Sequence, residues 1–301
     1  MIQLLGFLAS ASLLAPARAE ALPGRLPTAV AVVDGRARLA GPTRERVEPV
    51  VRINAPSAFV ADVATGRVLY ARDPHRVLPI ASLSKLATAM VFLDLKTDMD
   101  VEVTMQASDF DDESRPVFKV GDRFTRAELF DAMMVGSVNA AANALARSTL
   151  GTEAFVAAMN RKVRELSLAS PVFVEPSGID PRNRANAADV AAMVTIAAGY
   201  PEVRMSTAKR SVDIRSRSTN EPYRIQTTNL NLGTGWAKPF EIVAAKTGSL
   251  PEAGYCMAQV TRSDAEGGTV VAVELAADDH FARYGDIRAL TSWAFDAFRW
   301  K

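Results

Sequence analysis

The hydrophobic period changes twice along this chain of 301 residues, and that change limits the folds open to it. Residues 57–63 and 67–71 read as two strands on either side of Ala64-Thr65-Gly66, which predicts a hairpin. Helical patterns fill roughly 80–210. Short strands return in the last third, at 242–247, 255–261 and 269–275. We therefore expect an α/β (α+β) fold, with one sheet closed by N- and C-terminal segments and a helical region inserted between them.

Local start and stop signals set the expected helix boundaries. Thr125-Arg126-Ala127-Glu128 forms a capping box, and the helix that it opens runs to Val135 and stops at Gly136. Asn186 and Gly199 bracket another helix in the same way. The remaining helices are expected at 82–95, after Ser137, at 152–168 and at about 283–298.

Charge and cysteine content exclude several classes of function. The 35 basic and 34 acidic residues give a net charge of +1, and no block of like charge points to nucleic acid or an anionic membrane. The single cysteine, Cys256, cannot form an internal disulfide, and metal-ligand spacing is absent. We interpret Cys256 as a small buried hydrophobe and expect no metal and no cofactor.

The N-terminal segment has the features of an export signal. Residues 2–14 are mostly apolar, and Ala17-Arg18-Ala19 offers a cleavage site, although no Lys or Arg precedes the apolar run. The sequence predicts a signal peptide at 1–19, a proline-containing linker at 20–56 and a catalytic domain at 57–301. An exported protein, periplasmic or secreted and soluble after signal cleavage, is expected.

Three short motifs carry the expected chemistry: Ser82-Leu83-Ser84-Lys85, Ser137-Val138-Asn139 and Lys246-Thr247-Gly248. The first two patterns recur by chance about once in a chain of this length. Second copies stand here at Ser206-Thr207-Ala208-Lys209 and Ser218-Thr219-Asn220. These copies lie close together in a polar, arginine-rich segment without an apparent apolar face. Ser82, by contrast, opens an apolar helix that can hold a nucleophile rigidly.

The spacing within the motifs suits nucleophilic catalysis. A serine hydroxyl needs an adjacent base, and Lys85 lies one helical turn from Ser82. Burial and the positive Lys246 would both lower the pKa of Lys85. Ser137 can relay a proton to the leaving amine, and Asn139 can hold a substrate amide. Lys246 and Thr247 can bind an anionic group, while Gly248 lets backbone approach the ligand closely.

Other polar residues receive plainer interpretations. His75 and His280 lie outside any triad context, which disfavours a histidine-based hydrolase. His280 follows Asp278 and Asp279, and we expect a solvated loop there instead of a metal site.

The motif residues resemble a known family. Residues 79–90, 173–179 and 253–256 are similar to the low-molecular-mass penicillin-binding proteins of the D-alanyl-D-alanine carboxypeptidase type, and the likeness extends over about 57–300. It implies an antiparallel sheet flanked by helices, joined to an all-α subdomain. It implies acylation of Ser82 by D-alanyl peptide bonds of peptidoglycan stem peptides, and β-lactams as covalent inhibitors. The backbone N–H groups of Ser82 and Ser249 would form the oxyanion hole, and Arg283 would help hold the substrate carboxylate.

The resemblance leaves several functions open. The family contains carboxypeptidases and endopeptidases. The end of the chain at Lys301 and the serine at Ser249 favour the soluble endopeptidase type. A class A-like β-lactamase would need a glutamate to activate water, and the candidate Glu175 lies in a segment that we interpret as a structural loop. A non-catalytic module that senses β-lactams or cell wall is the third alternative.

Overall fold

The computed structural model describes residues 41–45, 51–110, 116–232 and 240–300. The predicted signal peptide and most of the predicted linker lie outside the described residues. The helical elements, with 3-10 turns labelled η, are η1 (Ala81–Ser84), α1 (Lys85–Asp94), η2 (Ala107–Asp109), α2 (Arg126–Val135), α3 (Asn139–Arg147), α4 (Thr152–Glu165), α5 (Ala187–Ala197), α6 (Pro201–Thr207), η3 (Leu230–Leu232) and α7 (Ala282–Ala297). The strands are β1 (Thr43–Arg44), β2 (Ser57–Asp62), β3 (Val68–Arg72), β4 (Leu78–Pro79), β5 (Glu102–Thr104), β6 (Arg123–Thr125), β7 (Arg184–Ala185), β8 (Ser211–Arg215), β9 (Pro222–Gln226), β10 (Phe240–Leu250), β11 (Gly254–Ser263), β12 (Gly268–Ala277) and β13 (Phe298–Arg299).

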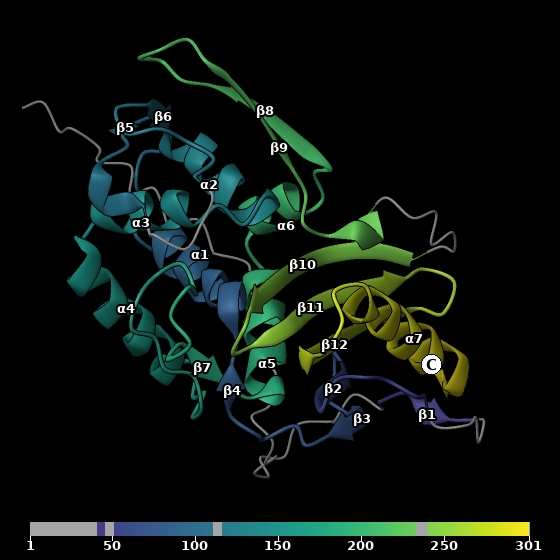
Figure 1. Ribbon diagram of the computed structural model, residues 1–301. Helices are drawn as coiled ribbons and strands as arrows, with labels where there is room; N and C mark the ends of the chain where they lie inside the picture. The colour runs from purple at the N-terminus through teal and green to yellow at the C-terminus, as the bar shows by residue number, and fades with distance from the viewer. Residues whose placement is uncertain (1–40, 46–50, 111–115, 233–239, 301) are drawn as a thin grey trace, which may run out of the picture.

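The predicted sheet is present and has five antiparallel strands in the order β10-β11-β12-β2-β3. Successive side chains of a strand point to opposite faces. Val271 and Val273 accordingly join the core under the helical region, while Val270 and Ala272 join a second core that includes α7. Helix α7 therefore covers one face of the sheet and α5 the other (Figure 1). The helical insertion is attached between β3 and β10, as the sequence predicts.

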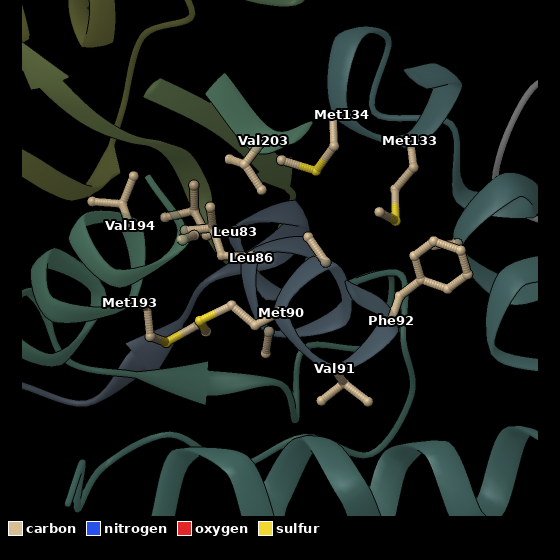
Figure 2. Packing of buried hydrophobic residues seen from close by; sticks show 14 of the residues in the cluster. Leu83, Leu86, Met90, Val91, Phe92, Met133, Met134, Met193, Val194 and Val203 are labelled. Atoms are coloured by element: carbon tan, nitrogen blue, oxygen red, sulfur yellow. The ribbon is translucent and has the colours of Figure 1, made fainter. Parts of the chain in front are cut away.

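Helix α1 is the centre of the helical region. Leu83, Leu86 and Met90 are fully buried, and Figure 2 shows them facing Met193 and Val194 of α5 and Val203 of α6. Phe92 at the other end of α1 stacks on Phe130 of α2, with ring centroids 5.8 Å apart. Helix α1 has apolar residues on every side, which is the pattern of a helix buried on all sides. The same packing holds the start of the helix, where Ser82 lies, in a fixed position.

Most predicted boundaries are confirmed by hydrogen bonds. The Thr125 hydroxyl accepts from the Glu128 N–H, the Glu128 carboxylate accepts from the Thr125 N–H, and Gly136 caps the end of α2. Asn186 caps α5 through the N–H of Asp189. Two boundaries differ clearly. The first turn of the helix expected at 82–95 is the 3-10 turn η1, and the helix expected at 152–168 ends at Glu165.

One sequence expectation was wrong. Residues 206–220 were expected to lack an apolar face, but the segment contains the end of α6 and the first strand of the β8–β9 hairpin. Ile214 of β8 and Ile225 of β9 are both buried. Each strand of the hairpin contributes only part of the buried face. Neither strand alone therefore shows a clear apolar pattern among its polar and arginine residues.

Part of the predicted linker contacts the domain. Ile53 and Ala55 are buried against the α7 side of the sheet. Strand β1 pairs antiparallel with β13, so that Thr43 lies opposite Arg299. No helix among the described residues is long and apolar enough to cross a membrane.

Candidate active site

Ser82 lies in η1, where the helical insertion meets the edge strand β10. Ala81, the residue before it, has φ +48°, a left-handed conformation that costs energy for a side chain with a Cβ. Gly248 of β10 faces this turn, and a Cβ added there would lie 2.8 Å from Ile80 O and 3.0 Å from Ser82 N. Only glycine therefore lets the strand approach the Ser82 backbone this closely, as the third motif requires.

Lys85 is fully buried and points to the Ser82 hydroxyl. Its Nζ lies 2.9 Å from Ser82 Oγ and 2.7 Å from Asn139 Oδ1, and it also donates to the backbone carbonyl of Ser177. The first contact lies within the first motif, and the second joins the first motif to the second. The amide of Asn139 contacts the lysine in this structure, so its predicted contact with substrate stays a prediction.

Ser137 and Lys246 form a second pair. Ser137 occupies the turn between α2 and α3 with φ +59°, and its Oγ lies 2.7 Å from Lys246 Nζ. Lys246 is 2% exposed and also donates to Thr247 O at 3.0 Å. Burial, with the positive charges of Lys85 and Arg283, lowers the pKa of Lys246 well below its ordinary value. A buried lysine of this kind gives up its proton more readily than an exposed one.

The rest of the third motif lines the same edge. Thr247 Oγ1 donates to Thr228 Oγ1 at 2.7 Å, which links β10 to the segment after β9. Ser249 is exposed at the end of β10, opposite Tyr255 of β11. Sequence reasoning did not identify Thr228, since no motif marks it.

Arg283 is buried behind the strand. Its guanidinium donates to Gly248 O at 3.0 Å and to the Tyr284 hydroxyl at 2.7 Å, and it lies over the Tyr255 ring at 5.3 Å from the centroid. Only 4% of the residue is exposed, so the structure places it against the β10 backbone. The predicted contact with a substrate carboxylate stays a prediction.

His280 lies in the loop between β12 and α7, as expected, and its neighbours Asp278, Asp279 and Phe281 are exposed. Its ring packs edge-on against Tyr255 and Tyr284, and Nδ1 lies 3.3 Å from the Arg283 guanidinium. Burial and the Arg283 charge lower the pKa of His280. The loop is therefore exposed to solvent on both sides of His280, while the two tyrosine rings pack against the imidazole.

Glu175 lies in a structural loop, as expected. Its carboxylate accepts from the N–H and hydroxyl of Ser177, both at 2.6 Å, and from the N–H of Gly178 at 2.6 Å. Asn183 Nδ2 donates to it as well, at 2.8 Å. A carboxylate with these donors has the bonding of a loop cap. Sequence analysis missed that the same loop supplies Ser177 O to Lys85.

The duplicate Ser-x-x-Lys motif has a different structure. Ser206 Oγ donates to Asp131 Oδ1 and Lys209 Nζ to Asp131 Oδ2, both at 2.6 Å. The serine and lysine thus share a carboxylate and are not directed at each other. This geometry agrees with the expectation that Ser82, and not Ser206, is the nucleophile.

Possible metal ligands and the cysteine can also be located in the described part of the chain. Its His, Cys, Asp and Glu residues form no group that could hold a metal ion. Cys256 is fully buried, as expected, and burial raises the pKa of its thiol to about 12. An uncharged thiol is a poor nucleophile.

A hydroxyl beside a buried amine, with a second hydroxyl–amine pair next to it, is the equipment of a serine acyl-transfer enzyme. The comparisons agree with this class. The family model described as D-alanyl-D-alanine carboxypeptidase matches residues 43–279, and the chain belongs to this family of serine hydrolases, which includes penicillin-binding proteins.

Named relatives and solved structures support the same assignment. The chain is 34% identical over 241 residues to a D-alanyl-D-alanine endopeptidase of Pseudomonas aeruginosa, covering 79% of this chain and 76% of that one. It is 30% identical to the corresponding Escherichia coli endopeptidase, covering 80% and 77%. The D-alanyl-D-alanine carboxypeptidase of Mycobacterium tuberculosis matches with a TM-score of 0.75 at 26% identity, over 84% of this chain and 95% of that chain.

Proposed function

We propose that the protein hydrolyses D-alanyl peptide bonds of peptidoglycan stem peptides through an acyl-enzyme on Ser82. The observation that carries the proposal is the 2.9 Å contact between Lys85 Nζ and Ser82 Oγ beside the edge strand. Ser82 Oγ attacks the D-alanyl carbonyl carbon while its proton passes to Lys85. The backbone N–H groups of Ser82 and Ser249 stabilise the oxyanion.

Collapse of this intermediate breaks the peptide bond. The leaving amine takes a proton that Ser137 relays, and Lys246 can resupply Ser137 because their side chains are in contact. Water then attacks the Ser82 ester and releases the shortened peptide. Asn139, Lys246 and Thr247 are the proposed substrate contacts, with Gly248 allowing the peptide to lie along β10 and Arg283 acting on its carboxylate side.

β-Lactams are proposed as covalent inhibitors for the same reason. They acylate Ser82, and the ester is then long-lived because Glu175 is engaged by Ser177 and Gly178 and has no free role in activating water. This bonding counts against the β-lactamase alternative. A related penicillin-binding protein of Listeria monocytogenes, 27% identical with a TM-score of 0.72 over 82% of this chain and all of that one, was solved in a cefotaxime-bound form.

Of the two activities in the family, we propose that this protein is an endopeptidase, which cleaves cross-links, and not a carboxypeptidase. The relatives from Pseudomonas aeruginosa and Escherichia coli are named endopeptidases and align over more than three quarters of this chain. A carboxypeptidase of Mycobacterium tuberculosis is 36% identical, but over 42% of this chain. Digestion of purified muropeptides separates the two activities, since an endopeptidase yields monomers from cross-linked dimers and a carboxypeptidase yields free D-alanine.

We also propose export of the protein, with residues 1–19 as the signal peptide, 20–56 as a linker and 57–301 as the catalytic domain. The apolar run and Ala17-Arg18-Ala19 support this proposal, and the substrate class lies outside the cytoplasm. Fractionation of cells and N-terminal sequencing of the mature chain test it. A mature protein that begins at Met1 in the cytoplasm would contradict it.

Intact-mass measurement with benzylpenicillin tests the proposed chemistry. We expect a slowly decaying adduct of one penicilloyl group on the native chain and none on Ser82→Ala. Rapid turnover without an adduct would instead indicate a β-lactamase. Absence of both adduct and hydrolysis would favour the non-catalytic sensing module.

A further inference from the structure

The loop capped by Glu175 contacts Lys85 through a single peptide unit. The carbonyl of Ser177 accepts a hydrogen bond from Lys85 Nζ, and the N–H of the same peptide unit, that of Gly178, donates to Glu175 Oε1 at 2.6 Å. The peptide bond is trans, so its oxygen and hydrogen point in opposite directions. One peptide group therefore lies between the amine of Lys85 and the carboxylate of Glu175.

The position of this peptide unit is fixed by its surroundings. Gly178 has φ +86°, and a Cβ there would lie 2.2 Å from Ala81 O and 2.8 Å from Ser82 N. Thr88 Oγ1, one turn along α1 from Lys85, donates to Pro176 O at 2.6 Å. The loop is thus packed directly against the backbone that carries Ser82.

Asn183 holds the other side of the loop to the same turn. It is fully buried, and its Nδ2 donates to Glu175 Oε1 at 2.8 Å and to Ser84 Oγ at 3.2 Å. Its backbone carbonyl accepts from Ile80 N at 3.1 Å. A shift of the Glu175 carboxylate would therefore displace η1 as well as Ser177.

The two carbonyl oxygens around Lys85 decide how its amine can act. Asn139 Oδ1 and Ser177 O accept hydrogen bonds but cannot donate them. A neutral amine that gives its two hydrogens to these oxygens turns its lone pair toward Ser82 Oγ, the orientation a general base needs. A carboxylate at the far end of the Ser177–Gly178 peptide polarises that unit and strengthens the acceptor.

We propose that Glu175 is a positioning residue for Lys85, acting through the Ser177–Gly178 peptide unit. The proposal rests on the acyl-enzyme chemistry above. In it, Glu175 contacts no substrate and activates no water. It fixes the Ser177 carbonyl, the acceptor that orients Lys85. Its negative charge favours the ammonium form of Lys85, whereas the positive Lys246, which faces the same site from β10, favours the neutral form.

The test is the pH profile of acylation by benzylpenicillin in Glu175→Gln. Wild-type protein must first form the Ser82 adduct, and failure at that step would contradict the proposed function and not this inference. In the variant we expect the plateau rate constant to fall at least about tenfold, because the base is misaligned. We also expect the acid limb to move to lower pH, because the ammonium form loses its support.

A matched control separates this effect from loss of a loop cap. Asp189 Oδ2 accepts from the N–H and hydroxyl of Ser170, at 2.9 and 2.6 Å, which repeats the Glu175–Ser177 bonding far from Lys85 in sequence. Asp189→Asn is expected to lower the melting temperature and to keep the wild-type acid limb and plateau.

The outcomes decide the proposal. A Glu175→Gln protein with unchanged plateau and limb, or with a lower plateau and an unmoved limb, would limit Glu175 to supporting the loop and overturn the link to Lys85. If that variant does not fold, Ser177→Ala replaces it, since this change removes the Ser177 hydroxyl and keeps its carbonyl. Ser177→Ala loosens the Glu175 carboxylate but keeps its charge, so a lower plateau with an unmoved acid limb supports the proposal, and a wild-type profile overturns it.

Discussion

Lys246 Nζ lies 2.7 Å from Ser137 Oγ, so a buried amine on the edge strand contacts the hydroxyl of the α2–α3 turn. The pKa of Lys246 is lowered by burial first and by Lys85 and Arg283 next. Two buried lysines in one site repel as ammonium ions, and this repulsion contributes to the lowered pKa of Lys246.

Ser137→Gly tests the second pair without straining the backbone. Ser137 has φ +59°, a conformation that glycine adopts freely, so the variant keeps its fold and its melting temperature. Loss of the hydroxyl is expected to slow peptide cleavage about 10²- to 10⁴-fold, the usual size of a general acid–base contribution. The measurement is single-turnover cleavage of a D-alanyl peptide, and a variant with wild-type rates would remove Ser137 from the proton path.

Gly248→Ala tests the close approach of β10 to Ser82. The added Cβ would lie 2.8 Å from Ile80 O, and the strand must move away from the nucleophile. We expect acylation by benzylpenicillin to fall about 100-fold. The matched change is Gly285→Ala on α7, where a Cβ meets nothing within 4 Å. That control should stabilise the protein by up to ~1 kcal/mol and acylate normally, and an equal loss in both variants would count against the steric argument.

Glu274→Gln is expected to change how stability depends on pH. Glu274 is fully buried on β12, and burial and Asp286 raise its pKa well above the ordinary value. Its favourable protonated form is present in the folded state at acid pH and is lost as pH rises through the raised pKa, so this group destabilises the protein in alkali. Glutamine stays neutral, and its amide can donate to Asp286.

The melting temperature of Glu274→Gln relative to wild type should therefore be higher at pH 9 than at pH 5, by an amount equivalent to about 1–3 kcal/mol. The exposed Glu241, paired with Arg262, supplies the control Glu241→Gln, whose difference from wild type should not change with pH. A pH-independent difference for Glu274→Gln would show that its carboxyl titrates alike in both states.

Arg283→Lys separates two roles for this buried arginine. Its bond to Gly248 O predicts that it orients β10, and a lysine cannot reproduce the planar fork. We expect acylation by benzylpenicillin and by its methyl ester to fall by a similar factor, about tenfold. A loss confined to the free carboxylate form would assign Arg283 directly to the substrate carboxylate.

Ser206→Ala tests the duplicate motif. The hydroxyl donates to Asp131 and is buried, so its loss should cost about 1 kcal/mol of stability. Acylation by benzylpenicillin should remain at the wild-type rate. Loss of the adduct in this variant would mean that the wrong Ser-x-x-Lys motif has been assigned to catalysis.

The sequence predicted the features that depend on local signals. Residues close together in the sequence determine the capping box at Thr125, the Asn186 cap and the β2–β3 hairpin. All three features are present. The β8–β9 hairpin was missed because its buried side chains, Ile214 and Ile225, come from two strands separated by a polar turn.

Long-range contacts in the site were the hardest to foresee. The motifs predicted that Ser82 and Lys85 share a helix face, and the 2.9 Å contact agrees. Nothing in the residues around Glu175 shows that its loop reaches Lys85, since 89 residues separate the two in the sequence. The contact of Arg283 with Gly248 O was equally hard to predict, because only the packing of α7 on the sheet brings the two residues together.

The pairing of β1 with β13 has a consequence for how the backbone could be rearranged. Thr43 and Arg299 lie opposite each other, and the Trp300 side chain donates to Asp62 in the first hairpin. Ends that meet in this way can be joined by a short peptide with little distortion. A circular form made from Thr43 to Trp300 would leave η1 and β10 untouched, and the ring closure would reduce the entropy of its unfolded state.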